Sequence, residues 1–112
     1  MSVTAKCLKE STAVGNTDTT MYTATNCRTI IDKVTATNYT GGAVTLSINM
    51  VPSAGAVASS NLILYLRSIA AGEDYLCPEL VGQILNSGDF ISMIASAGTS
   101  ISVRISGREI TG

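Results

Sequence analysis

The sequence predicts an all-β fold: an antiparallel β-sandwich, jelly-roll-like, with one short helix near residues 79–86. Apolar and polar residues alternate along most of the chain, which is the period of strands with one buried face. Thr and Ser contribute 14 and 13 of the 112 residues, whereas charged residues make up only 13%. This composition is typical of β structure and not of a solvated helical bundle.

The length of 112 residues is enough for one domain and too short for two. We expect residues 19–112 to form a single β-sandwich domain and residues 1–18 to form an N-terminal arm or an edge strand. Seven or eight predicted strands suit either a jelly-roll or an immunoglobulin-like topology. True immunoglobulin domains carry a Cys-Trp-Cys pattern and this chain has no Trp, so we favour the jelly roll.

Two segments, 43–51 and 100–106, show the clearest alternation, 89–96 resumes it, and 19–23 is predicted as a short strand. Every second residue of the two clear segments is apolar: Val44, Leu46, Ile48, Met50, Ile101, Val103 and Ile105. Each of these strands is expected to have one buried face and one wet face.

The segment 30–39 is rich in β-branched residues and is followed at once by Gly41, Gly42 and the strand at 43–51. Glycine accepts the positive φ that tight hairpin turns require. The sequence therefore predicts an antiparallel hairpin between 30–39 and 43–51.

The segment 61–69 is apolar on both faces. Such a strand is either central in the sheet or covered by another chain, and the pattern leaves both open. The preceding residues, 51–60, have no periodicity and predict a loop that contacts a partner.

The short helix is predicted from residues that favour a helix start, from apolar residues at helical spacing and from residues that favour a helix end. Pro78 and Glu79 suit the first helical turn, and Asn86-Ser87-Gly88 suits the stop. The apolar residues between them recur at helical spacing: Leu80, Val81, Ile84 and Leu85.

Histidine is absent, which excludes Ser-His-Asp and Cys-His machinery and mixed Cys/His zinc sites. The adjacent pair Glu73 and Asp74 is expected to be a solvated turn and not a cation site. We therefore expect no enzymatic activity, no catalytic residues, no metal and no cofactor.

The three cysteines, Cys7, Cys27 and Cys77, are an odd number at wide spacing. They are too few for a structural zinc, which needs four ligands. Buried free thiols in a reducing cytoplasm are the simplest interpretation, and a bond between Cys7 and Cys27 stays open.

Seven basic and eight acidic residues give a net charge of −1, which provides no electrostatic basis for binding nucleic acid directly. No run of 18 apolar residues and no signal-peptide apolar region is present. We expect a soluble protein made in the cytosol, with neither nucleic acid nor membrane as a partner.

Long charged and exposed apolar side chains are the candidates for contact with a partner. They are Lys6, Lys9, Ile63, Tyr65, Arg67, Arg104 and Arg108. Arginine often anchors an interface, although charges on a wet strand face are also ordinary and discourage edge-to-edge pairing.

A series of strand ends and turns recurs in a recognisable order from about residue 19 onward. The segments are Thr19-Thr20-Met21-Tyr22-Thr23, Asn38-Tyr39-Thr40-Gly41-Gly42-Ala43-Val44-Thr45-Leu46, Leu64-Tyr65, Ile69-Ala70-Ala71-Gly72-Glu73, Leu85-Asn86-Ser87-Gly88-Asp89 and Ile105-Ser106-Gly107-Arg108-Glu109-Ile110-Thr111. In order and spacing they resemble the small β-sandwich virion proteins of tailed bacteriophages.

This resemblance implies a capsid decoration or cement protein without enzymatic activity, whose partners are the major capsid protein and a second copy of itself. It implies a homodimer or another small homo-oligomer on the capsid exterior, assembled in the cytoplasm of the host bacterium. The alternative is a tail or fibre attachment module, an adhesin that binds a virion or host-surface partner.

Overall fold

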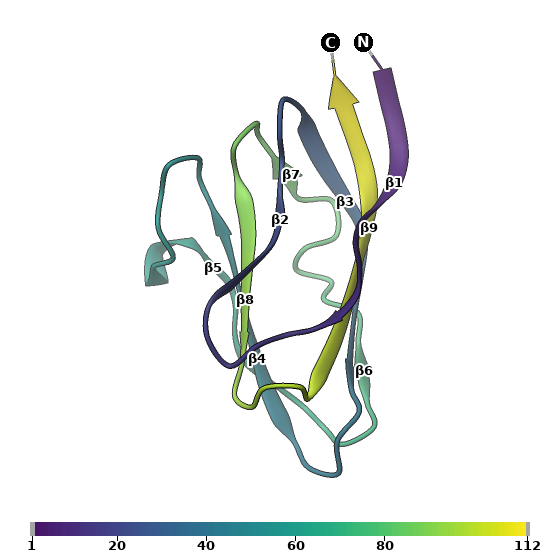
Figure 1. Ribbon diagram of the computed structural model, residues 1–112, viewed down its shortest axis with the longest axis vertical. Coiled ribbons are helices and arrows are strands. Elements are labelled where there is room, and N and C mark those ends of the chain that lie inside the picture. Colours follow the sequence, from purple (N-terminus) through teal and green to yellow (C-terminus); the bar gives the residue numbers. More distant parts are fainter. Residues whose placement is uncertain (1, 112) are drawn as a thin grey trace.

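Two antiparallel sheets face each other in the computed structural model, which describes residues 2–111 (Figure 1). The first sheet has the order β1-β9-β3-β6, with β7 also paired to β3: β1 (Ser2–Ala13), β9 (Ile101–Thr111), β3 (Arg28–Asn38), β6 (Asp74–Tyr75) and β7 (Ile84–Leu85). The second sheet has the order β2-β8-β4-β5: β2 (Thr19–Thr23), β8 (Phe90–Ala95), β4 (Val44–Val51) and β5 (Leu62–Ile69). The all-β antiparallel sandwich is confirmed.

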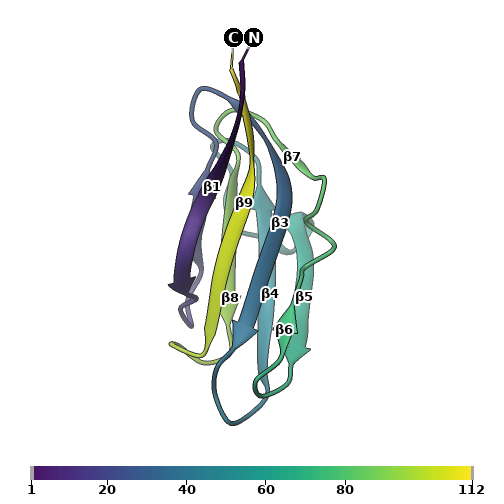
Figure 2. The ribbon, with the colours of Figure 1, turned by 90° about the vertical axis from the view of Figure 1, so that its right-hand side faces the viewer.

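The strand pairing is that of a jelly roll, because the chain pairs as one long hairpin that has been rolled up. β4 pairs with β5 at the middle of this hairpin, β3 with β6 and β7, β2 with β8, and β1 with β9. Contacts between β3 and β9 and between β4 and β8 then join these pairs into two sheets. Figure 2, in which the first sheet faces the viewer, shows β9 between β1 and β3.

The core lies between the sheets, and alternate residues of β3, β4 and β9 fill much of it. The predicted apolar positions of β4 and β9 are among its fully buried members: Leu46, Ile48, Ile101, Val103 and Ile105. The outward positions of β9 carry Ser and Arg instead. The predicted alternation is confirmed for β9, whereas in β4 the inward positions are as predicted only as far as Ile48, and the face expected to be wet is buried at Ser47 and Asn49.

The predicted helix near residues 79–86 is wrong. The chain there forms successive turns, in which Leu80 N–H bonds the carbonyl of Cys77 and Gln83 N–H bonds the carbonyl of Leu80, and then strand β7. Ile31 of β3 bonds this segment through both Gly82 N–H and the Gln83 carbonyl. Because Gly82 N–H and the Gln83 carbonyl bond strand β3, they are not available for the hydrogen bonds of a helix. The one helical turn of residues 2–111 is the 3₁₀ turn η1 (Ser59–Asn61).

The predicted hairpin between 30–39 and 43–51 is also wrong, because β3 and β4 belong to different sheets. Their connection crosses from one sheet to the other, and neither Gly41 nor Gly42 has a positive φ. The buried side chain of Asn38 holds the crossing in place by donating to the carbonyls of Gly42 and Ile69, both at 2.8 Å.

Strand β5, predicted from its two apolar faces to be either central or covered, is not central but an edge of the second sheet. A β-bulge explains its unusual pattern: Tyr65 and Leu66 together face the single residue Ser47 of β4, and Leu66 has φ +49°. The bulge leaves Tyr65 and Leu66 exposed. No helix within residues 2–111 has the length and apolar character needed to cross a bilayer.

Candidate functional site

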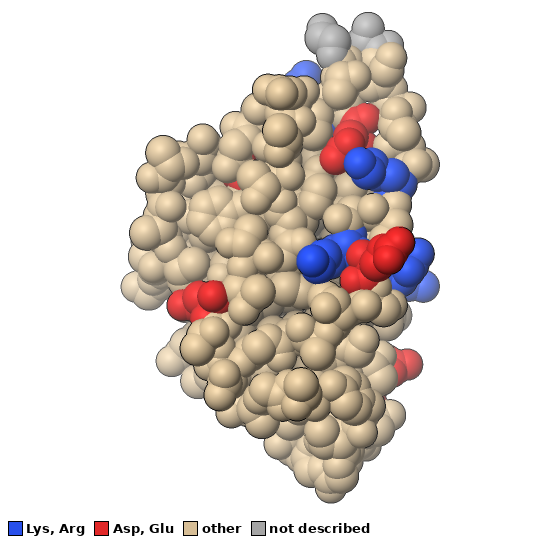
Figure 3. Space-filling view, in the orientation of Figure 1, with Lys and Arg blue, Asp and Glu red and all other residues tan. Residues whose placement is uncertain are grey.

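The charges of the molecule are unevenly divided between the two sheets. Six of the seven basic residues and three of the eight acidic ones lie on β1, β3 and β9. These strands thus carry a net charge of +3, although the whole chain has −1. Figure 3 shows the visible charges gathered mainly over β1 and β9, with few elsewhere on that face.

The outer face of the first sheet carries much of this positive charge. The buried residues of β9 are at odd positions, so Arg104 and Arg108 point outward. In the register of the sheet, Arg104 lies beside Thr35, and Lys33 beside outward-facing Ser106. Arg108 forms a two-pronged ion pair with Asp32, with N–O distances of 2.9 to 3.2 Å. We call this surface the cationic face.

A network of polar side chains joins the two sheets at one end of the sandwich. Tyr22 of β2 donates to Glu109 of β9 at 2.5 Å and lies 2.7 Å from the hydroxyl of Thr29 on β3. Lys6 of β1 reaches the other carboxylate oxygen of Glu109 at 3.2 Å. The hydrogen bond from Tyr22 and the charge of Lys6 lower the pKa of Glu109, whereas burial and the carboxylate raise the pKa of Tyr22.

Replacing Glu109 by Gln is expected to reduce the unfolding free energy at pH 7 by about 1–2 kcal/mol, because charge-assisted hydrogen bonds from Tyr22 and Lys6 are weakened. A lowered pKa stabilises the folded state above the unfolded value of about 4.3, and this contribution disappears as the pH falls through the folded value. The difference between wild type and variant should therefore shrink below about pH 4. Urea unfolding across this pH range measures it, and Glu10→Gln, at an exposed position, should show no such difference.

The second sheet presents an outer face of a different kind. Strands β2, β4 and β8 contain no charged residue at all. The outward positions of β4 carry Thr45, Ser47 and Asn49, which alternate with the core residues Leu46 and Ile48.

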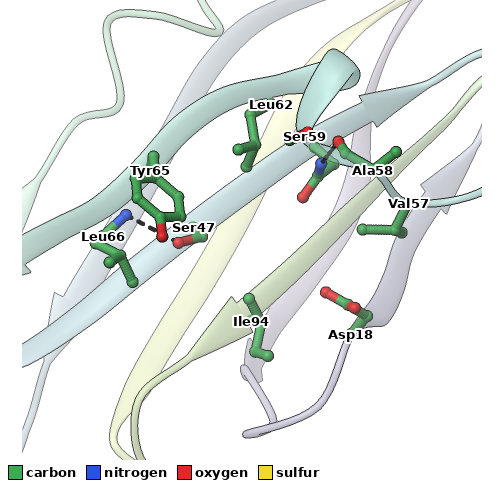
Figure 4. A pocket seen from close by; sticks show the side chains of 10 residues that line it. Asp18, Ser47, Val57, Ala58, Ser59, Leu62, Tyr65, Leu66 and Ile94 are labelled. Atoms are coloured by element: carbon green, nitrogen blue, oxygen red, sulfur yellow. Dashed lines mark hydrogen bonds between the residues drawn. The ribbon is translucent and has the colours of Figure 1, made fainter.

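A hollow of about 330 Å³ lies on this outer face, between β5, β8 and the loop that precedes η1 (Figure 4). Ser47 and Asn49 of β4 and Ile94 of β8 line it, and Tyr65 and Leu66 of β5 lie at one side. A smaller hollow of about 110 Å³ shares Ser47, Leu66 and Ile94 with it. The two hollows together form a groove along the outer face of the second sheet.

The seven residues predicted to contact a partner do not form one site. Arg104 and Arg108 lie on the cationic face, and Lys6 belongs to the network around Glu109. Lys9 lies half-buried on β1, where the register with β9 shifts on both sides of it.

The other three of these residues are on β5 and point in different directions. Tyr65 lines the hollow, Ile63 packs against the core, and Arg67 lies over the ring of Tyr75 with its guanidinium carbon 4.5 Å from the centroid. The bulge of β5 explains this dispersion, since it interrupts the simple alternation of the strand.

Asn49 and Asp18 were not predicted from the sequence as site residues, and the hydroxyl-rich face that carries Ser47 was expected to be a solvated sheet face more than a sugar-binding one. Both Ser47 and Asn49 lie on the face of β4 that the alternation predicts to be wet, yet Ser47 is only 5% exposed and Asn49 only 3% exposed. Two polar residues beside the core positions of a strand rich in apolar residues are a usable signal, because polar groups are buried only where partners or a site require it.

All three cysteines are free thiols, and Cys27 and Cys77 are buried. Burial raises the pKa of the Cys77 thiol to about 12. This thiol is therefore protonated at neutral pH and packs as a small apolar side chain. Within residues 2–111, no group of three Cys, Asp or Glu side chains is placed to hold a metal ion.

Fold and surfaces together define a jelly-roll β-sandwich with two chemically different outer faces, one cationic and the other grooved and with few charges. No protein family matches the chain, and no curated protein matches it. Among solved structures, it is similar to a chain in the structure of infectious bursal disease virus, Gx strain, with a TM-score of 0.51 and 15% identity over 96% of its own residues. The chain spans 30% of the length of that viral chain. At this identity the likeness shows the shared fold.

Proposed function

We propose that the protein is a structural bacteriophage virion protein that decorates or cements the capsid exterior by bridging subunits of the major capsid protein. The observation that carries the proposal is the cationic face, which concentrates positive charge on the outer side of one sheet of a rigid jelly roll. The jelly-roll fold that the chain shares with a chain of a virus structure supports a place in a virion.

The cationic face suits docking to an acidic surface that spans neighbouring capsid subunits. Arg104, Lys33 and Arg28 are exposed and form no ion pair with a described residue, so they are available to carboxylates of a partner. Because the three strands β1, β9 and β3 form one hydrogen-bonded sheet, these side chains keep fixed spacings. Many copies, each with a modest contact, would strengthen the joints of a shell by their number.

Charge reversal at Arg104 tests this docking surface. Arg104→Glu should weaken binding to shells that lack the protein by at least about ten-fold, because it replaces attraction to an acidic partner by repulsion. Cosedimentation of purified protein with shells from the encoding phage, deleted for this protein, measures the affinity. Cryo-electron microscopy of the decorated shells then locates the added density.

Arg67→Glu is the matched control, since it makes the same charge change on β5 of the other sheet. It should bind shells as the wild type does. Equal losses for the two variants, or binding to phage DNA in place of shells, would contradict docking through the cationic face. Density confined to the tail would move the protein to the alternative class, a tail or fibre attachment module.

A further inference from the structure

The hollow of the second sheet contains hydrogen-bonding groups that the protein leaves unused. The side-chain amide of Asn49 donates to Ala58 O at 2.9 Å and to Asn61 Oδ1 at 2.7 Å. Ser47 Oγ accepts from Leu66 N–H at 2.9 Å. No residue in the described range 2–111 donates to Asn49 Oδ1 or accepts the hydroxyl hydrogen of Ser47.

These unused groups are accessible from the hollow. The described chain contains no fully buried side-chain nitrogen or oxygen without a hydrogen-bond partner, so Asn49 Oδ1 must retain access to the outside. Asn49 and Ser47 both line the hollow, and at least 95% of each residue is buried. An acceptor and a donor are thus fixed side by side at its base by the bonds that hold the loop and the bulge.

The sides of the hollow combine one aromatic ring, aliphatic side chains and further polar groups. Tyr65 is 68% exposed and lies at one side, Leu62 lies near the 3₁₀ turn, and Val57 lies across the hollow from Tyr65 (Figure 4). The carboxylate of Asp18 faces into the opposite side, and Ser59 adds a hydroxyl group.

The lining determines the chemical class of the ligand. It contains a carboxylate and no Lys or Arg, which disfavours an anion. Hydrogen-bonding groups that alternate with apolar surface suit a ring with C–H faces and several hydroxyl groups. The volume of about 330 Å³ is at the lower end of the range of small-ligand sites, which begins at about 300 Å³.

We propose that this hollow binds a neutral sugar residue of a glycan. One C–H face of the sugar packs on Tyr65, and its hydroxyl groups bond the Asp18 carboxylate, Asn49 Oδ1 and the Ser47 hydroxyl. The smaller hollow of about 110 Å³, which continues past Ser47 to Thr45 and Ser96, provides room for part of a second residue. The site is on the opposite sheet from the cationic face, so it is additional to capsid docking.

The test is a titration of isotope-labelled protein with neutral methyl glycosides and disaccharides of glucose, galactose, mannose and N-acetylglucosamine, followed by NMR. We expect saturable shifts at Ser47, Asn49 and Tyr65 with at least one neutral sugar, and tighter binding of its disaccharide. Glucuronate and sialyllactose serve as anionic probes and should bind more weakly. No saturable binding of any neutral sugar, or preference for the anionic probes, would overturn the proposal.

Tyr65→Ala should weaken the binding about ten-fold by removing the stacking surface, and Asp18→Asn should weaken it several-fold. Tyr39→Ala is the matched control, because Tyr39 is also exposed, at 54%, but lies on the connection between β3 and β4. Equal effects of the two tyrosine variants would refute the site. Both tyrosines are exposed, so unchanged melting temperatures are expected and will separate loss of binding from loss of fold.

The two proposals fail independently. Tyr65→Ala should leave attachment to shells unchanged, and Arg104→Glu should leave sugar binding unchanged, because the two residues lie on different sheets. Absence of sugar binding would therefore contradict the glycan site and not the capsid docking. Absence of shell binding would contradict the capsid docking and not the glycan site.

Discussion

Replacing Gly107 by alanine is expected to destabilise the protein by about 3–5 kcal/mol, a large part of the total of about 5–15 kcal/mol. Gly107 lies in β9, where β3 and β1 approach from either side. A methyl group there would overlap the carbonyl oxygen of Ile30 and come within 2.9 Å of Leu8 Cδ1. The oxygen of Ile30 belongs to the backbone of a paired strand, so relief requires the sheet itself to move.

Urea unfolding followed by circular dichroism measures the loss. Gly41→Ala is the control, since a methyl group at Gly41 has no neighbour within 4 Å and Gly41 has no positive φ. It should leave stability unchanged or raise it slightly by restricting the unfolded chain. Equal stabilities of the two variants would show that β9 and β3 do not approach as closely as described.

Replacing Asn38 by alanine is expected to cost about 3–4 kcal/mol. Its side chain is buried and donates to the carbonyls of Gly42 and Ile69, and its Oδ1 accepts from the backbone N–H and the hydroxyl of Thr40. Alanine would leave several of these groups without partners in a region that water reaches poorly. The connection between β3 and β4 would lose the hydrogen bonds that Asn38 makes to it.

Two further variants sharpen this experiment. Asn38→Asp keeps the shape and the acceptor but removes the amide donor, so it should remain well below wild type at pH 7. Asn86→Ala removes an exposed amide that bonds no described residue through its side chain, and its unfolding midpoint should match wild type. A midpoint for Asn38→Ala equal to that of Asn86→Ala would contradict the role of Asn38.

The sequence predicted strands correctly where the alternation of apolar and polar residues directly reflects which side chains are buried. The alternation in β4 and β9 reports which side chains face the core, and the sandwich follows from several such strands. It failed at β7, where residues with helical spacing were available but Ile31 of another strand bonded their backbone instead. The hydrophobic period shows which side chains can share a buried face. It does not show whether a backbone group will bond within a helix or bond a neighbouring strand.

The crossing after β3 and the hollow were hidden for a related reason. A Gly-Gly connection suits a hairpin and a crossing equally, and the decision lies in Asn38, whose partner Ile69 is far away in the sequence. The hollow depends on the bulge at Leu66 and on the loop fastened to Asn49. Tyr65 was recognised as a contact residue from its exposed apolar character, but the residues opposite it become visible only once the strands are paired.

The central position of β9 has a consequence for how the chain folds. β9 is the last strand of the described chain, yet it is the strand that pairs with β1 and the main partner of β3, whose pairings with β6 and β7 are short. During synthesis these two strands leave the ribosome before β9 does. The backbone groups that will pair with β9 therefore stay unpaired until β9 has been made. The many pairings between distant residues predict slow folding, in the millisecond-to-second range typical of such topologies. Until β9 is synthesised, β1 and β3 are the segments most exposed to pairing with other chains, and chaperones are expected to bind there first.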